Sequence, residues 1–510
     1  MAPAVLPITG YMDRLSARPG ESLAVKVSAQ GGGSYEAAVV RIRHADPNPA
    51  GPGLKYEPQP GLGGRFPARH QPAHPGSYAR VPASRHWAGP RLVASLLVQP
   101  WLLREAPATL LAVGDAASEG WRLTAGKSGL ALVTTAGGRV ELPLRLKRRQ
   151  WYRVWCALDA VSGRLLLGCA TLAGEVLGCV AGQGGVVLPA ADLTLAAQLD
   201  TGVATGFFNG RLEDPALHAA WPGDDRPPPA PDEGLQGLVA WWDFSQAIET
   251  QAILDQGPHA LNGALVNVPT RAVPGARWNG EEMVWHQAPG HYAAIHFHED
   301  DLYDCGWETD FELAIPAGLR SGVYGLRLRH QGAEDIVPFY VLPPRGRPGA
   351  KVCVLASSFT YQAYGNHARG NFAGALAERV QAWGAAPYNP DDYPTYGRST
   401  YNFHPDGTGH AFSSRLRPLL TVRPGFVTFP DERGSGLRHF SADTHLLDWL
   451  EQKGIAYDVV TDEDLDDEGV ALIEDYATVL TGSHPEYHTK GTLDALEAYT
   501  GDGGKLAPVV

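Results

Sequence analysis

Cysteine is scarce in this sequence. Its 510 residues contain five, Cys156, Cys169, Cys179, Cys305 and Cys353, and no two of them form a Cys-x-x-Cys pair. An odd number without such pairs argues against both a disulfide framework and a thiolate zinc site. We therefore expect all five to be small apolar residues of the interior, in a reducing compartment.

Basic residues and long apolar runs are also in short supply. The 42 Lys and Arg face 55 Asp and Glu, which leaves a net charge of -13 and argues against a nucleic-acid partner. Apolar stretches such as residues 93–103 fall short of the ~18 residues that a membrane span needs. The start, MAPAVLPITGYMDR, shows no basic segment followed by an apolar one. We expect a soluble, cytoplasmic protein that does not contact a membrane.

The length predicts about three or four domains, each with its own core. Short β-branched or aromatic runs between Gly, Pro, Asn and Asp clusters indicate an all-β region from residue 8 to about 345. Residues 1–82 begin a small β-sandwich, and residues 83–282 have the turn spacing of a larger antiparallel jelly roll. Residues 283–347 return to strand patterning and are long enough to complete the small sandwich. We predict a jelly roll inserted into an immunoglobulin-like sandwich.

Two phrases carry a resemblance within the larger β region. QWYRVWCALDAVSGRLLLGC and GFFNGRLEDPALH resemble the concanavalin-like, laminin-G type of jelly roll. The stretch GLVAWWDFSQ is similar to the edge strand that begins such a domain, yet it follows the Pro-rich linker DDRPPPAPDEG. A permuted or continued sandwich explains this order, because a further complete domain does not fit before residue 280.

Residues 348–510 show a different period. KVCVLAS is a continuous apolar run, typical of a strand buried on both faces, and helical and strand patterns alternate after it. This alternation predicts a parallel α/β sheet, similar to that of the glutamine amidotransferases. Because KLAPVV begins a strand where the sequence stops, we expect this domain to be incomplete, with groups from later strands absent.

Ligands of open parallel sheets bind beyond the carboxyl ends of the strands, which selects two loops. These loops, SFTYQAYGN and SHPEYHT, supply the candidates Tyr361, Tyr364, Ser483, His484, Glu486, Tyr487 and His488. Between them lies a long Tyr- and Gly-rich excursion, residues 385–440, and loops of this length are usually functional or disordered. The turn Gly482–Glu486 lacks the second Gly of a nucleophile elbow, and the sequence supplies no placed base for Ser483.

Four phrases resemble the large (beta) subunit of the N,N-dimethylformamidase family: TYQAYGN, STYNFHPDGTG, THLLDWLEQKGIAYDVVTDEDL and LTGSHPEYHT. The likeness extends more loosely over most of the chain. It implies a mononuclear Fe(III) held by Tyr364, Tyr401 and Glu486, with His484 as a catalytic residue beside the metal. It also implies a small (alpha) subunit as partner in a hetero-oligomer, and hydrolysis of small linear amides such as N,N-dimethylformamide to formate and dimethylamine.

The chemistry of that trio is consistent with the implied metal. Two phenolates and a carboxylate are hard oxygen donors that suit Fe(III), and their three charges would balance it. A free Tyr has a pKa near ~10, so only a strong Lewis acid would keep both phenols ionised at neutral pH. Positions would remain open for water and an amide carbonyl. His484 could stabilise an oxyanion when protonated, or take a proton when neutral.

Other interpretations stay open. Tyr364 and Tyr401 are ordinary half-buried aromatics in one of them, Glu486 is a helix-start carboxylate, and Tyr361 competes as the first ligand. The rival function is a binding protein, whose sandwiches present a carbohydrate or protein surface beside a degenerate α/β domain.

Two further groups contain residue types that bind metals. His296 and His298 alternate along a predicted strand and share a face, which is metal-ligand spacing. His404, Asp406 and His410 follow Tyr401 and could orient its ligand atoms.

Overall fold

The computed structural model describes residues 4–219, 227–228, 237–369, 372–431 and 433–508. The chain divides into two compact units. The first comprises Met1–Ala73, Tyr303–Asn402 and Gly409–Val510, and the second His74–Leu302 and Phe403–Thr408. The second unit is thus inserted between two parts of the first and includes a short piece of the later chain. Most of the linker DDRPPPAPDEG lies outside the described residues.

Two sheets of the first unit form a small sandwich. One has the order β1 (Ile8–Met12), β3 (Ser22–Ala29) and β24 (Phe311–Ala314). The other has the order β2 (Ser16–Ala17), β26 (Ala333–Val341), β25 (Gly322–His330), β4 (Ser34–His44) and β5 (Lys55–Pro67). Alternate residues of β3 are buried, as the apolar-polar alternation of its sequence predicts.

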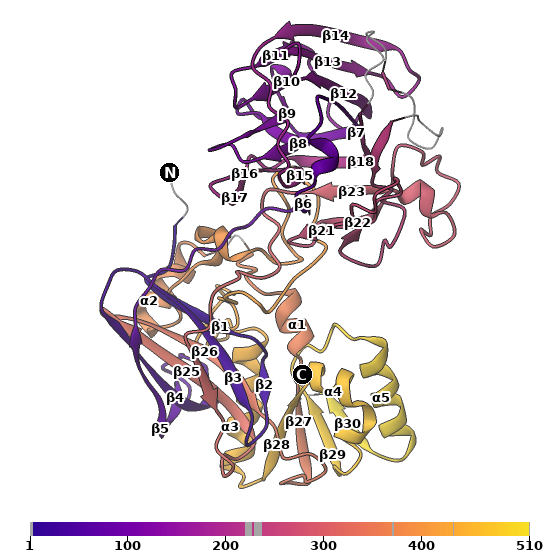
Figure 1. The fold of residues 1–510 in the computed structure, drawn as a ribbon. Coiled ribbons are helices and arrows are strands. Elements are labelled where there is room, and N and C mark those ends of the chain that lie inside the picture. Colours follow the sequence, from indigo (N-terminus) through magenta and orange to yellow (C-terminus); the bar gives the residue numbers. More distant parts are fainter. Residues whose placement is uncertain (1–3, 220–226, 229–236, 370–371, 432, 509–510) are drawn as a thin grey trace. The chain divides into compact units, whose positions relative to one another are not determined.

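Strands from far apart in the sequence pair within this sandwich. β24 pairs with β3 and sets Phe311 opposite Val25, and β25 pairs with β4 and sets Tyr324 opposite Arg41. Residues 311–341 therefore complete sheets that residues 8–67 begin (Figure 1).

The second unit contains two large sheets. The order of the first is β11 (Arg139–Leu142), β10 (Gly129–Thr134), β9 (Gly120–Gly126), β8 (Ala108–Gly114), β15 (Leu193–Leu195), β6 (Tyr78–Val81), β21 (Gly263–Val266) and β20 (Ala252–Ile253). The order of the second is β14 (Val176–Gln183), β13 (Arg164–Ala170), β12 (Tyr152–Asp159), β7 (Arg91–Leu102), β18 (Asn209–His218), β23 (Ala294–Phe297) and β22 (Thr270–Val273), with β19 (Leu238–Trp241) paired to β18. A short hairpin joins β16 (Gln198–Asp200) to β17 (Val203–Thr205).

One continuous apolar core stabilises this second unit. Its largest fully buried side chains include Trp87, Phe208, Trp242, Phe244 and Phe297. Burying a side chain of this size stabilises a fold by about 1.5–3 kcal/mol. Within the described residues no disulfide is present. Four of the five cysteines are buried, as expected, whereas Cys179 is half-buried.

The edges of the predicted domains differ from the observed strand pairing. β6, which the prediction places in the small sandwich, pairs with β15 and β21. The prediction also places β23 in the completion of that sandwich, but β23 pairs with β18, with Leu212 opposite Ile295. The physical reason is that Ile295 and Phe297 are buried in the core of the second unit. A strand pattern indicates burial and does not specify which sheet supplies it.

A parallel four-stranded sheet completes the first unit. Its order is β28 (Tyr457–Thr461), β27 (Val352–Ala356), β29 (Thr478–Thr481) and β30 (Lys505–Pro508). The α-helices are α1 (Ser358–Ala363), α2 (Ala375–Trp383), α3 (Phe440–Gln452), α4 (Asp462–Glu468) and α5 (Lys490–Gly501). Short 3-10 turns lie at Arg85–Trp87, Pro289–Tyr292, Pro390–Asp392, Pro394–Tyr396 and Gly469–Leu472. Among the helices described, none has the length and apolarity to cross a membrane.

Local signals explain where these helices begin. Thr461 caps α4 by accepting a hydrogen bond from the backbone N–H of Asp464, and acidic residues fill its first turn, where the helix dipole favours them. Thr489 and Thr492 form a reciprocal capping box at the start of α5. α3 packs its apolar face against β4 and the parallel sheet, which joins the sandwich and the sheet in one core.

A buried carboxyl group at the start of α4 makes the stability of the first unit depend on pH. Asp462 accepts a hydrogen bond from the backbone N–H of Phe359, and burial raises its pKa to about 7, with Glu463 and Asp443 adding to the effect. The folded-state pKa of Asp462 lies above its unfolded value. Protonated Asp462 therefore contributes to the stability of the fold at low pH, and this contribution is lost as the pH rises toward about 7.

We predict that Asp462→Asn flattens this pH dependence. Between about pH 5 and pH 8 the melting temperature of the variant should fall less than that of the unchanged chain, because Asn does not titrate. One titrating group changes the free energy of unfolding by at most about 1.4 kcal/mol per pH unit. Scanning fluorimetry measures this. Asp467→Asn, at an exposed position of the same helix, is the matched control; equal slopes for all three chains would contradict the prediction.

Candidate metal centre

Three segments of the first unit bring the predicted ligands together. Tyr364 caps the carboxyl end of α1, which follows β27. Glu486 and His484 lie in the loop after β29, and β27 and β29 are neighbouring parallel strands. Tyr401 comes from the long excursion between α2 and α3. Both strands end at the same edge of the sheet, so their loops can meet there, as the sequence analysis expects.

We call Tyr364, Tyr401 and Glu486 the Tyr–Glu cluster. The Tyr364 hydroxyl donates to Glu486 Oε2 at 2.6 Å, and the Tyr401 hydroxyl lies 3.2 Å from both carboxylate oxygens. The two phenol rings stack at 3.9 Å with an angle of 13°. His484 Nε2 lies 3.1 Å from Glu486 Oε2. One carboxylate is therefore surrounded by two phenols and an imidazole.

Neighbouring side chains extend the cluster. Tyr487 Oη lies 2.8 Å from Tyr401 Oη. The Arg438 guanidinium lies 3.8 Å from the centre of the Tyr364 ring, and the His439 ring lies 4.4 Å from it. Arg438 and His439 were not among the residues predicted from the sequence. They precede the phrase THLLDWLEQKG, and only the folded structure shows that they lie against Tyr364.

α1 supports both loops of the site. The buried hydroxyl of Thr360 accepts hydrogen bonds from the backbone N–H groups of Glu486 at 3.0 Å and Tyr487 at 3.2 Å. The carbonyl of Ala363 accepts hydrogen bonds from the hydroxyls of Ser399 and Thr400, each at 2.8 Å. A single helical turn thus fixes the backbone on either side of Tyr364.

Tyr361, the alternative first ligand, points elsewhere. It is buried, its hydroxyl donates to Asp443, and the backbone N–H of Ser483 donates to the same carboxylate at 2.6 Å. Burial raises the pKa of both Tyr361 and Asp443. Tyr361 therefore stabilises the loop beneath the Tyr–Glu cluster, and its oxygen is not among the clustered atoms.

The three residues predicted to orient Tyr401, namely His404, Asp406 and His410, are divided between the two units. His410 donates its backbone N–H to the carbonyl of Asn402 in the first unit. His404 and Asp406 belong to the second unit, where they lie near His296 and His298.

Electrostatics in the cluster favour protonated phenols around a charged carboxylate. Burial raises the pKa of Tyr364 and of Tyr401. The hydrogen bond to Glu486 raises the pKa of Tyr364 further, and the hydrogen bonds with Tyr364 and Tyr487 raise that of Tyr401. The hydrogen bond from Tyr364 lowers the pKa of Glu486. The phenolic protons therefore lie between the phenol oxygens and the Glu486 carboxylate. A cation bound among these oxygens would displace the protons. Both phenol oxygens lie within 3.2 Å of the Glu486 carboxylate, and this set of hard oxygen donors fits Fe(III).

A nearby histidine stays neutral. Burial, with the charge of Arg438, lowers the pKa of His439 to about 2, and Arg438 Nε donates to His439 Nε2 at 3.0 Å. His439 therefore packs against Tyr364 without adding charge.

The chain is therefore mostly β-sheet, and the loops of its parallel sheet position a site rich in oxygen atoms. The family description "N,N-dimethylformamidase beta subunit-like, C-terminal" matches residues 270–509. The N,N-dimethylformamidase beta subunit of Paracoccus aminophilus is 35% identical over 98% of this chain and 70% of that protein. That of an Alcaligenes species is 32% identical over the same shares. The chain belongs to the N,N-dimethylformamidase beta subunit family, which confirms the resemblance found in its motifs.

Solved structures match the chain at low similarity. A Limulus polyphemus pentraxin shares 16% identity, covering 30% of this chain and 73% of that one with a TM-score of 0.21. The laminin α2 LG1–3 region shares 15% identity, covering 30% and 31% with a TM-score of 0.23. Mouse laminin α1 LG4–5 shares 14% identity, covering 33% and 46% with a TM-score of 0.22.

A buried asparagine organises the excursion that carries Tyr401. Asn366 adopts a left-handed backbone (φ 66°), and its amide donates to the carbonyls of Tyr396, Gly397 and Pro418. Its Oδ1 accepts from the N–H of Leu420 at 2.6 Å.

We predict that Asn366→Ala destabilises the first unit by about 2–4 kcal/mol, because it leaves several buried backbone groups without a partner. Asn366→Asp should also be destabilising, since it replaces the amide donor with an acceptor facing three carbonyls. Urea unfolding followed by fluorescence measures both. Stabilities within about 0.5 kcal/mol of the unchanged chain would refute the role assigned to Asn366.

Proposed function

We propose that this chain hydrolyses the C–N bond of small linear amides such as N,N-dimethylformamide, giving formate and dimethylamine. The observation that supports this best is the convergence of Tyr364, Tyr401 and Glu486 from three separate segments onto one point. Membership in the family supports it independently, because the relatives are named for this reaction.

Tyr364, Tyr401 and Glu486 would hold the Fe(III). When bound, the ion supplies Lewis acidity to polarise an amide carbonyl and acidify water. Arg438 would favour the ionised form of Tyr364, because a cation at 3.8 Å from the ring stabilises added negative charge. Tyr364 stacks on Tyr401, and both hydroxyls contact Glu486 Oε2.

His484 is the group that would move the proton. Its side chain is half exposed, so it can reach both the cluster and a substrate, and its Nε2 lies near the carboxylate. In hydrolysis a water oxygen bonds to the carbonyl carbon, the C–N bond breaks, and the nitrogen must gain a proton. His484 Nε2 would take that proton from the attacking water and deliver it to the departing amine.

Strand order and the names of the relatives support further assignments. The parallel order of β27–β30 with its helices supports the amidotransferase-like fold, and the paired sheets of residues 8–67 and 311–341 support the immunoglobulin-like sandwich. The relatives' name, beta subunit, supports a hetero-oligomer with a small alpha subunit. The cytoplasm is the compartment that we infer, since the chain shows no disulfide among its described residues.

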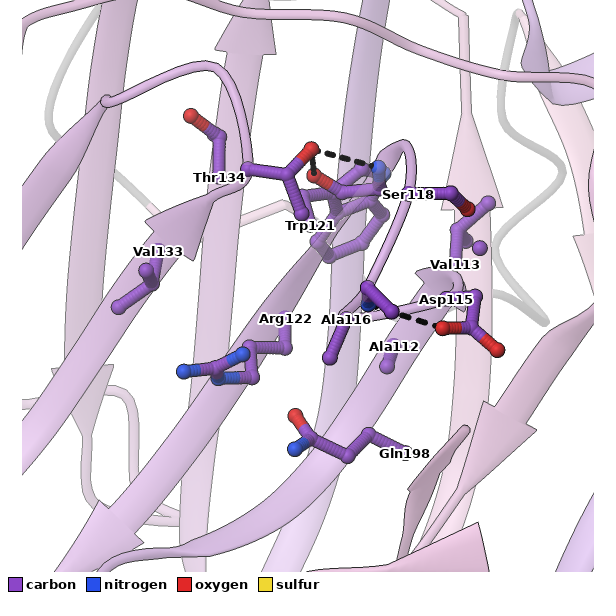
Figure 2. A pocket seen from close by; sticks show the side chains of 14 residues that line it. Ala112, Val113, Asp115, Ala116, Ser118, Trp121, Arg122, Val133, Thr134 and Gln198 are labelled. Atoms are coloured by element: carbon purple, nitrogen blue, oxygen red, sulfur yellow. Dashed lines mark hydrogen bonds between the residues drawn. The ribbon is translucent and has the colours of Figure 1, made fainter. Parts of the chain in front are cut away.

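One cavity favours the rival function, a binding protein. The second unit has a pocket of about 370 Å³ beside β8, β9 and β10, lined by residues that include Trp121, Arg122 and Gln198 (Figure 2). Its Asp115 carboxylate already accepts backbone N–H groups, including those of Ala117 and Gly202. Arg122 and Gln198 would remain to bind a polar ligand such as a sugar. Binding of sugars without amide hydrolysis would favour this function.

We predict that Tyr401→Phe abolishes most of the activity and the visible colour of the iron-loaded protein. Formate release from N,N-dimethylformamide should fall by about 100-fold or more, because loss of one ligand weakens both binding and charge balance. Tyr361→Phe is the matched control, since Tyr361 lies one helical turn before Tyr364 and donates its hydroxyl to Asp443 instead of Glu486.

The control should keep the iron and the colour. Formate assay and visible absorption, after iron loading together with the partner subunit, measure both. Equal loss in the two variants, or colour retained in Tyr401→Phe, would contradict the ligand assignment.

A further inference from the structure

A second group of metal-binding residue types lies in the second unit. We call His296, His298 and Asp406 the His–Asp cluster. All three are buried, with 2%, 1% and 2% of their surfaces exposed. His296 Nε2 lies 2.9 Å from Asp406 Oδ2, and His298 Nε2 lies 3.6 Å from the same oxygen. One ligand atom from each residue falls within 4.8 Å of the others.

The backbone explains why the three side chains meet. His296 and His298 are two residues apart on an extended segment, so both point to the same face, and their rings stack at 4.3 Å. Asp406 belongs to the short later segment Phe403–Thr408, which lies in this unit. Asp406 Oδ1 accepts hydrogen bonds from the N–H and hydroxyl of Thr408, which leaves Oδ2 facing the imidazoles.

Neighbouring groups orient the donors as they do around bound metals. His298 Nδ1 lies 3.1 Å from Asp301 Oδ2, which also accepts a hydrogen bond from the hydroxyl of Ser77 at 2.6 Å. A histidine that donates Nδ1–H to a carboxylate can present its Nε2 lone pair to a metal. His298 Nε2 lies 3.0 Å from Thr408 Oγ1, and a bound ion would replace this contact. The Trp101 ring lies 4.9 Å from that of His296 and gives this histidine an aromatic neighbour.

We propose that His296 Nε2, His298 Nε2 and Asp406 Oδ2 bind one zinc ion. Two imidazoles and a carboxylate form a donor set suited to Zn²⁺, and donors around a tetrahedral zinc lie about 3.4 Å apart, between the two distances observed. The ion fixes Phe403–Thr408 to β23, and this segment begins two residues after Tyr401. The site shares no ligand with the Tyr–Glu cluster and does not depend on the proposed function.

The test uses the 510-residue chain with Tyr401→Phe and Glu486→Gln, which removes competing metal binding by the Tyr–Glu cluster. This background is loaded with Zn²⁺, desalted and analysed by plasma mass spectrometry, and one zinc per chain is expected. Adding His296→Ala or Asp406→Asn should remove that zinc. His218→Gln is the matched control, because His218 is a buried histidine of the same unit, and it should keep the zinc. Asp301→Asn should weaken zinc binding by about 10- to 100-fold.

A second measurement does not depend on the folding of the cluster variants. Zinc-edge X-ray absorption of the loaded background should show scattering from two imidazoles. A folded background that retains no zinc, a spectrum without imidazole scattering, or a folded Asp406→Asn chain that keeps its zinc would overturn the proposal. The His–Asp cluster would then be a buried hydrogen-bonded network only.

Discussion

The carboxylate of Glu486 is the point on which the proposed site depends. It accepts hydrogen bonds from the phenols of Tyr364 and Tyr401, and His484 lies beside it, so three segments of the first unit converge on one charge. Without a positive ion the charge is shared with phenolic protons. With one, the same geometry offers three hard oxygen donors. The backbone of Glu486 is also held in place, because its N–H donates a hydrogen bond to the hydroxyl of Thr360.

The fold brings these segments together through a parallel sheet joined to a sandwich. β27 and β29 end at one edge of their sheet and deliver Tyr364 and Glu486 there. α3 packs against β4 on one side and the sheet on the other, which positions His439 and Arg438 at its start. Asn366 holds the excursion that carries Tyr401. The proposed site therefore depends on a core that combines β4 with residues of the parallel sheet and its helices.

The sequence predicted what local pattern and motif can determine. Buried runs such as KVCVLAS revealed the parallel strands, and the loops that follow them contain Tyr364 and Glu486. Tyr401 required the family resemblance, because no local rule connects an irregular excursion to a sheet edge.

Pairing between distant segments could not be predicted. β23 reads as a strand in either sandwich, and only the burial of Ile295 and Phe297 in one core decides where it pairs. Arg438 and His439 were missed for the same reason: their role comes from lying against Tyr364, and their own sequence gives no periodic or spacing signal.

Resonance Raman spectroscopy of the iron-loaded 510-residue chain tests the central claim most directly. The account predicts tyrosinate vibrations enhanced by the visible absorption band, reduced in Tyr364→Phe and in Tyr401→Phe and unchanged in Tyr361→Phe. Iron bound to the chain without any tyrosinate vibration would contradict it.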